Sequence, residues 1–165
     1  MKAVAFTSCT ASETIETDAR VPPCDLDAEG MVIGFALIHG IDELGGDLDA
    51  RHFYADANRF VYEAIQELSG ALPAPLDTAS IRRYLEDRKH WAAVGSQYLA
   101  RLYDTIPASA APHARSHAAA IVECWKRRVL IAAFREAEAK LYAGDLNSQQ
   151  AWDHVKEAVR AQRKD

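Results

Sequence analysis

The feature that most constrains this fold is a stretch of about 30 residues, 112–142, with no helix breaker after its opening proline. One continuous helix of that length spans ~45 Å at ~1.5 Å per residue, more than the radius of a domain this size requires. Its middle, residues 129–134, is Val-Leu-Ile-Ala-Ala-Phe and is apolar on every side. Such a helix must be covered on more than one side, so the stretch predicts a long helix with several packing partners.

The residues that follow predict a second, shorter helix that folds back on the long one. Residues 144–145 favour a turn, and Asn147 or Ser148 is suited to cap the new helix. Its one narrow apolar stripe consists of Trp152, Val155 and Val159. Two helices joined by so short a turn are expected to form an antiparallel hairpin.

An isolated hairpin of this kind buries too little apolar surface to be stable in water. Its apolar segment must therefore pack against the rest of the domain or against a second copy of the hairpin. We favour the second copy, because the outer end of the hairpin cannot reach back to a domain attached at its base. The residues predicted to form this dimer or partner interface are Val129, Leu130, Ala133, Phe134, Trp152, Val155 and Val159.

The chain begins with a tail, residues 1–20, that lacks helical or strand periodicity and is expected to be disordered. Two prolines then precede Asp25, a good N-cap for a helix over residues 25–39. Asp27 and Glu29 place negative charge near the positive end of that helix.

Further local signals mark where the next helices begin. Gly30 and Gly34 lie in the first helix, where they are expected to permit close approach of another helix. Asp56 is expected to cap a second helix, in which apolar residues recur at helical spacing.

Two more helices are expected before the long one. Asp77 or Thr78 caps the first, Gly95 follows it, and Pro107 closes the second. No alternating apolar and polar run with hairpin turns occurs in the sequence, so we predict an all-α fold, a compact multi-helix head followed by a long antiparallel helical hairpin. The expected parts are a tail (1–20), a helical head (21–111) and a helical hairpin of the same domain (112–165).

Charge and composition disfavour several classes of function. A net charge of −5 argues against direct binding of duplex DNA, because phosphate contacts depend on Lys and Arg, and the basic run 126–128 is expected to be a solvated face. Cys9, Cys24 and Cys124 lack the close spacing of a zinc or disulfide motif and predict unpaired thiols. With no signal peptide and no apolar run of ~20 residues, we expect a cytoplasmic protein without a membrane segment.

No metal, cofactor or catalytic site is predicted. His113, His117 and Cys124 share one side of the long helix, but His117 and Cys124 are separated by ~10 Å of helix rise, too far for one ion with ligand bonds of ~2 Å. The acidic residues between 42 and 49 lie in a Gly-rich turn without a matching nucleophile, and we expect a solvated loop.

Several short motifs occur in an order that is characteristic of one family. They are Pro22-Pro23, Ala28-Glu29 and Val32-Ile33-Gly34, then Phe53 and the segments 59–65, 76–81, 94–99, 106–109 and 120–122. In this order and spacing they resemble the N-terminal domain of the bacterial replicative DNA helicase, the DnaB family. Departures from the family pattern are Asn58 in place of a frequent His, Ala111 in place of Asn, and Ala118 in place of Tyr.

The resemblance implies a domain that dimerises through its hairpins, forms a trimer-of-dimers collar on a hexameric ring, and docks the helicase-binding domain of primase, with a helicase loader as a further partner. The chain contains no Gly-x-x-x-x-Gly-Lys-Ser/Thr motif, so we predict no nucleotide site and no catalysis by this chain alone. The alternative is a stand-alone helical adaptor, of phage or mobile-element origin, that binds or modulates a host helicase.

Overall fold

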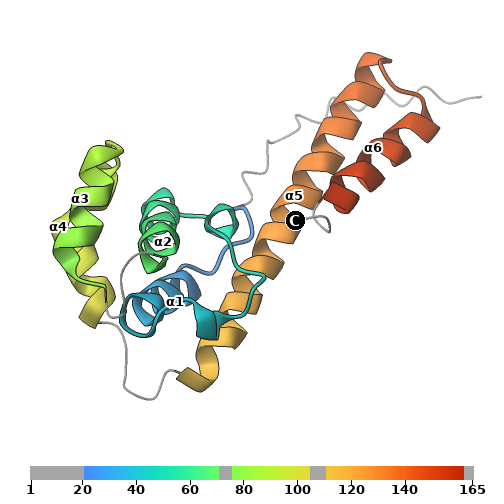
Figure 1. Ribbon diagram of the computed structural model, residues 1–165. Coiled ribbons are helices and arrows are strands. Elements are labelled where there is room, and N and C mark those ends of the chain that lie inside the picture. The colour runs from blue at the N-terminus through green and yellow to red at the C-terminus, as the bar shows by residue number, and fades with distance from the viewer. Residues whose placement is uncertain (1–20, 71–75, 105–110, 162–165) are drawn as a thin grey trace, which may run out of the picture.

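The computed structural model describes residues 21–70, 76–104 and 111–161, so the predicted tail and Pro107 lie outside the described residues. The helices are α1 (Leu26–His39), α2 (Asp56–Ser69), α3 (Thr78–Asp87), α4 (Trp91–Asp104), α5 (Ala111–Ala143) and α6 (Ser148–Ala161), with short 3-10 turns η1 (Asp42–Leu44) and η2 (Ala50–His52). Helices α1 to α4 gather into a head, and α5 runs past it to form a projecting hairpin with α6 (Figure 1). No described residue lies in a strand, and the all-α prediction is confirmed.

Most helix boundaries follow from the local signals in the sequence. Asp25 accepts a 2.9 Å hydrogen bond from the Ala28 N–H, and Asp77 accepts a 2.8 Å bond from the Ser80 N–H, so both predicted caps are confirmed. Gly95, with φ 71° and ψ 160°, interrupts α4 with a kink. The long helix and its turn into α6 also lie where the sequence places them.

The predicted cap of α2 is wrong. Ala55 occupies the N-cap position without a side-chain hydrogen bond, and Asp56 is already helical and pairs with Arg59 at 2.8 Å. The carboxylate of Glu29 in α1 instead accepts bonds from the Tyr54 N–H at 2.7 Å and the Ala55 N–H at 3.3 Å. A distant carboxylate thus satisfies backbone donors just before the helix, which no local spacing could indicate.

Helix α1 is the centre of the head and is covered on several sides by α2, α4 and α5. Its fully buried side chains include Val32, Ile33, Phe35, Ala36 and Leu37. The expectation of close packing at Gly30 is wrong, because a Cβ placed there would meet no atom within 4 Å. Gly34, by contrast, is buried.

Helix α5 serves both parts of the molecule. Ala114, Ala118 and Ile121 in its first half are buried in the head core, while Ala137 in its second half is buried in a separate cluster with α6. A hollow of about 250 Å³ lies beside Ala118, between α5 and the segment around η1.

No helix in the described parts of the chain combines the length and apolar character needed to cross a membrane.

The basic run 126–128 is only partly the solvated face that the sequence predicts. Arg127 is exposed and pairs with Glu123 at 3.0 Å. Arg128 is half-buried and donates to the carbonyl oxygens of Pro23, at 2.8 Å, and His52, at 2.6 Å. Arg128 therefore joins α5 to two distant segments of the head.

Candidate interaction surface on the hairpin

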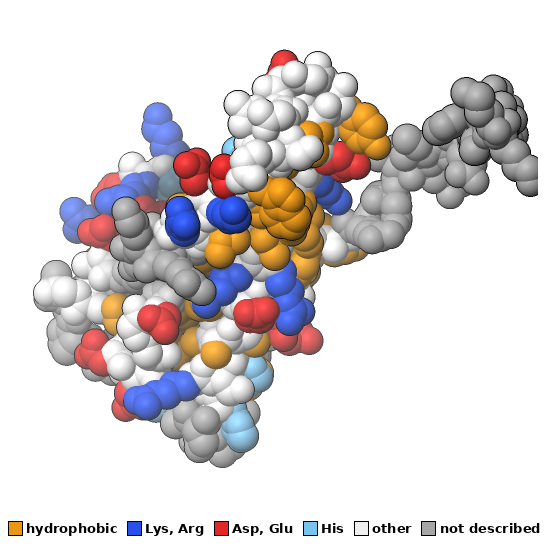
Figure 2. Space-filling model, turned by 90° about the vertical axis from the view of Figure 1, so that its right-hand side faces the viewer, with side chains coloured by type: hydrophobic (Ala, Val, Ile, Leu, Met, Phe, Trp, Pro, Cys, Tyr) orange, Lys and Arg blue, Asp and Glu red, His pale blue; other side chains and the backbone are white. Residues whose placement is uncertain are grey.

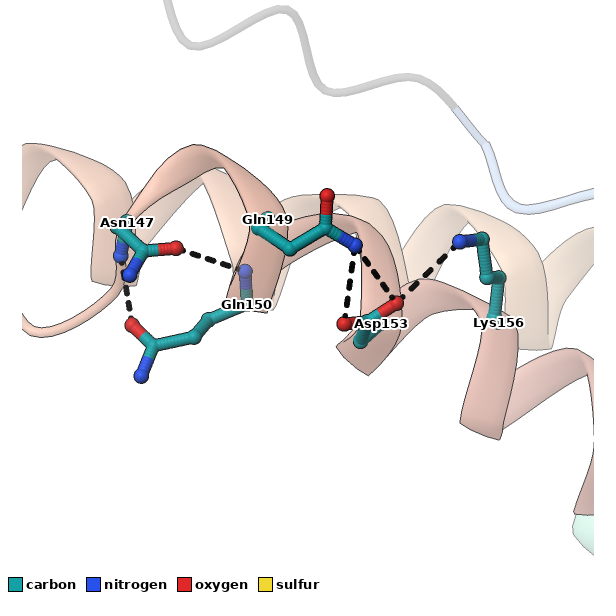
Figure 3. Close-up of polar contacts among 5 residues, drawn as sticks. All are labelled: Asn147, Gln149, Gln150, Asp153 and Lys156. Carbon is teal, nitrogen blue, oxygen red and sulfur yellow. Dashed lines mark hydrogen bonds and ion pairs between the residues drawn. The ribbon is translucent and has the colours of Figure 1, made fainter.

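The start of α6 is held by a reciprocal cap. The Asn147 side chain accepts a 3.0 Å bond from the Gln150 N–H, and the Gln150 side chain accepts a 2.9 Å bond from the Asn147 N–H (Figure 3). On the solvent side, Asp153 accepts bonds from the Gln149 side-chain amide at 3.2 and 3.1 Å and pairs with Lys156 at 3.3 Å. The pKa of Asp153 is lowered by these bonds, from Gln149 first and then Lys156.

The opposite side of α6 packs against α5 through small residues. Ala151 and Val155 are buried against Ala137, and Leu130 and Leu146 pack on this cluster. Small side chains let the two helix backbones approach closely. At one edge of the contact, His154 lies 3.3 Å from Glu136, whose pKa is lowered, mainly by its hydrogen bond from Lys140.

The other edge of the α5–α6 contact is an exposed apolar groove. Phe134, Leu141 and Trp152 are 48%, 44% and 60% exposed. They line a groove of about 290 Å³, whose lining residues are Phe134, Ala137, Leu141, Ser148, Ala151, Trp152 and Val155. The view onto the hairpin side of the molecule shows hydrophobic side chains gathered there between charged ones (Figure 2). None of the described residues that line this groove is titratable, so it suits apolar contact rather than proton transfer.

The seven predicted interface residues have different environments. Ala133 and Val155 are buried, Leu130 packs on the hairpin cluster, and Val129 and Val159 are half-buried. Phe134 and Trp152 are exposed, and with Val155 they line the groove. Val159 instead lines a hollow at the junction with the head.

Four residues that line the groove are absent from the predicted interface: Ala137, Leu141, Ser148 and Ala151. A signal for Leu141 was present, because positions 130, 134, 137 and 141 recur at the i, i+4, i+7, i+11 spacing of one helix face. Because the middle of α5 is apolar on every side, the spacing of apolar residues there does not show which side of the helix forms the interface.

A second polar arrangement lies where the head meets α5. His52 is buried, and its ring lies against that of Trp125 with centroids 4.4 Å apart and the two planes tilted by 54°. Its Nδ1 accepts a 3.0 Å bond from the Asp49 N–H. Burial, and then the charge of Arg51, lowers the pKa of His52. The described residues contain no group of three metal-ligating side chains, and His113 is exposed while His117 and Cys124 are half-buried.

These elements define the class of protein, an all-α domain whose long helix runs from a helical head into a projecting antiparallel hairpin. The family profile described as DnaB-like helicase N terminal domain matches residues 21–123, which cover the head and the first part of α5. The chain belongs to this family, and the resemblance seen in the sequence is confirmed.

Known proteins similar to the chain agree with that assignment. It is 34% identical over 118 residues to the replicative DNA helicase DnaB of Synechocystis sp., and 30% identical over 131 residues to that of Treponema pallidum. The matches cover 68% and 78% of this chain but only 13% and 27% of those relatives. The crystal structure of the N-terminal domain of DnaB helicase from Mycobacterium tuberculosis superposes with a TM-score of 0.73 at 28% identity, covering 86% of this chain and 99% of that one.

Proposed function

We propose that this chain acts in the cytoplasm as the collar, or scaffold, domain of a DnaB-type replicative helicase. In this proposal the hairpin (112–165) mediates self-association and docks the helicase-binding domain of primase and a helicase loader, while the head (21–111) supports it. The domain catalyses no reaction and binds no nucleotide. Its similarity to DnaB helicases of two bacteria supports a place in DNA replication.

The observation that carries the proposal is the groove between α5 and α6. Three large apolar side chains, Phe134, Leu141 and Trp152, are about half exposed around it. Exposed apolar groups that cluster in a groove favour association, and Trp is enriched among residues that dominate binding energy. The buried small residues beneath them hold the two helices in fixed register, so the groove is preformed.

Self-association through this surface is expected to be symmetric. A twofold axis would place Trp152 of one copy against Phe134 and Leu141 of the other, and the reverse. A pair of hairpins arranged in this way covers the apolar face of α5 that one chain leaves exposed, including Ile131.

Equilibrium sedimentation at tens of micromolar tests this step. We expect a dimer or larger species for the native chain, and a shift toward monomer of at least about tenfold in dissociation constant for Trp152→Ala. Leu26→Ala is the matched control, because Leu26 is 52% exposed on the head and lines no part of the groove. A native chain that sediments as a monomer would contradict the proposal. Equal effects of the two variants on the dissociation constant would show that the groove is not the self-association surface.

Primase docking is tested by titration calorimetry with an isolated primase C-terminal domain. We expect binding that Trp152→Ala or Phe134→Ala weakens and Leu26→Ala does not. Circular dichroism of each variant checks that the helices remain folded. Turnover of ATP by the purified chain would contradict the noncatalytic part of the proposal.

A further inference from the structure

Two cysteines from distant parts of the chain lie in segments that come into contact where the head joins α5. Cys24 lies in the non-helical segment just before α1, and Cys124 lies in the middle of α5. Both are free thiols and both are half-buried. Arg128, one helical turn after Cys124, donates a 2.8 Å hydrogen bond to the carbonyl oxygen of Pro23, the residue before Cys24.

The segment that ends in Cys24 packs against the part of α5 that follows Cys124. A hollow of about 460 Å³ is lined by residues 21–23 on one side and by Arg128, Ile131, Ala132 and Arg135 on the other. The segment before α1 therefore lies beside this part of α5. Cys24 directly follows Pro23, which accepts the bond from Arg128, and Cys124 lies one helical turn of ~5.4 Å before Arg128. We therefore expect the two thiols to lie near one another.

Electrostatics gives an independent sign that they are close. Burial raises the pKa of Cys124, and Asp25 and Cys24 raise it further, while Arg127 and Arg128 lower it. Charges on the segment that holds Cys24 thus act on the Cys124 thiol. Such an influence falls steeply with distance in a salt solution.

We propose that Cys24 and Cys124 form a reversible thiol–disulfide pair that low-molecular-weight disulfides such as oxidised glutathione convert to an internal cross-link. The cross-link ties the segment before α1 to the helix that carries the hairpin. The cross-link forms when the ratio of small disulfides to small thiols in the surrounding solution is high, and it is reduced when that ratio is low.

The reaction proceeds by two exchanges. The Cys24 thiol loses its proton and attacks one sulfur of oxidised glutathione, which forms a mixed disulfide and releases one glutathione thiolate. The Cys124 thiol then loses its proton, attacks the Cys24 sulfur and releases the second glutathione thiolate. Two protein thiols are oxidised by two electrons, and the small disulfide is reduced to two thiols, which take up the two protons.

The local backbone suits this cross-link. A disulfide requires Cα atoms roughly 4.4–6.8 Å apart, and Cys24 stands in an irregular segment that can adjust without breaking a helix. The loop closed by the bond contains nearly the whole head. Constraining a loop of that size in the unfolded chain is expected to raise the melting temperature by on the order of 10 °C.

Oxidation of a Cys9→Ser chain, which leaves only these two thiols, tests the proposal. After incubation with oxidised glutathione we expect loss of both free thiols, a chain lighter by two hydrogens, and a proteolytic peptide pair linked through Cys24 and Cys124. The melting temperature should rise and return when dithiothreitol is added. Peptide mapping of the native chain gives the same answer if Cys9→Ser disturbs folding.

The two single variants are the matched controls. Cys24→Ser and Cys124→Ser, each combined with Cys9→Ser, should each hold one glutathione as a mixed disulfide and show no rise in melting temperature. Glutathione on both thiols without an internal link, or links between chains only, would overturn the proposal. This outcome is independent of the proposed collar function, which is tested by sedimentation and primase binding.

Discussion

Glu29 and Asn58 are joined by a 2.8 Å hydrogen bond in the buried centre of the head, where each side chain is almost completely excluded from solvent. The Asn58 side chain also accepts a hydrogen bond from the Tyr98 hydroxyl. Because these residues belong to α1, α2 and α4, one network of hydrogen bonds connects the three helices. The same Glu29 carboxylate binds the backbone that precedes α2.

Replacing Glu29 should therefore be costly. Glu29→Ala leaves the Asn58 amide and the Tyr54 and Ala55 N–H groups without their acceptor, and we expect a loss of about 3 kcal/mol in the free energy of unfolding, measured in urea. Asp27→Asn, a change at an exposed position two residues before Glu29, should alter this free energy by less than about 0.5 kcal/mol. Similar losses for both variants would show that the buried network does not stabilise the head.

Two glycine substitutions should have opposite signs. Gly30→Ala adds a Cβ in open space inside α1 and should stabilise the protein by about 0.5–1 kcal/mol. Gly95→Ala also meets no neighbouring atom, but its φ of 71° with ψ of 160° is a conformation that only glycine adopts readily, and the expected loss is about 1–3 kcal/mol. Thermal unfolding followed by circular dichroism measures both, and equal effects would refute the backbone explanation.

Neighbouring arginines on α5 should differ in importance. Arg128→Ala removes two part-buried hydrogen bonds to backbone carbonyl oxygens and should cost about 2 kcal/mol in the free energy of unfolding. Arg127→Ala removes only an exposed pair with Glu123 and should cost at most about 0.5 kcal/mol. Hydrogen exchange of the backbone amides in residues 21–25 should become faster in Arg128→Ala but not in Arg127→Ala. Unchanged exchange in Arg128→Ala would show that Arg128 does not hold the N-terminal segment in place.

The stability of the head should decrease in mild acid because of His52. Burial and the nearby charges of Arg51, Lys126 and Arg128 hold the pKa of His52 below its ordinary value of 6.5, against a smaller opposite effect of Asp49. The unfolded chain therefore binds the proton first, and the contribution of neutral His52 is present above about pH 6.5 and lost as the pH falls through the folded pKa.

This dependence is measured by urea unfolding between about pH 7.5 and pH 5.5. His52→Gln retains an acceptor for the Asp49 N–H but cannot titrate, so the free energy of unfolding should fall less steeply with acid than in the native chain. Curves of the same slope for the two proteins would exclude His52 as the cause.

The features of the fold that could be predicted are those whose interacting groups lie close together along the sequence. The caps Asp25 and Asp77 were predictable, because each depends on residues within one helical turn. Asp56 was assigned a role of the same kind, but Glu29, far away in the sequence, supplies the carboxylate instead. Gly95 was expected to separate two helices, whereas α3 already ends at Asp87 and Gly95 lies at a kink inside α4.

The candidate interaction surface on the hairpin also has features that the sequence indicates and features that depend on helix packing. The hairpin and the apolar character of Phe134 and Trp152 follow from the spacing of apolar residues and a short turn. Which of them are exposed depends on the register of α6 on α5, which buries Val155 against Ala137 and leaves an open groove beside them. Leu141 joins the groove for the same reason.

The sequence by itself determined the helices, their order, the hairpin and the family, because these rest on local hydrogen bonding and on the period of apolar residues. Only the tertiary structure decided that Glu29 and Arg128 link distant segments of the chain and that Trp152 borders a groove. Those relationships join groups far apart in the chain, and their partners become defined only when the helices pack.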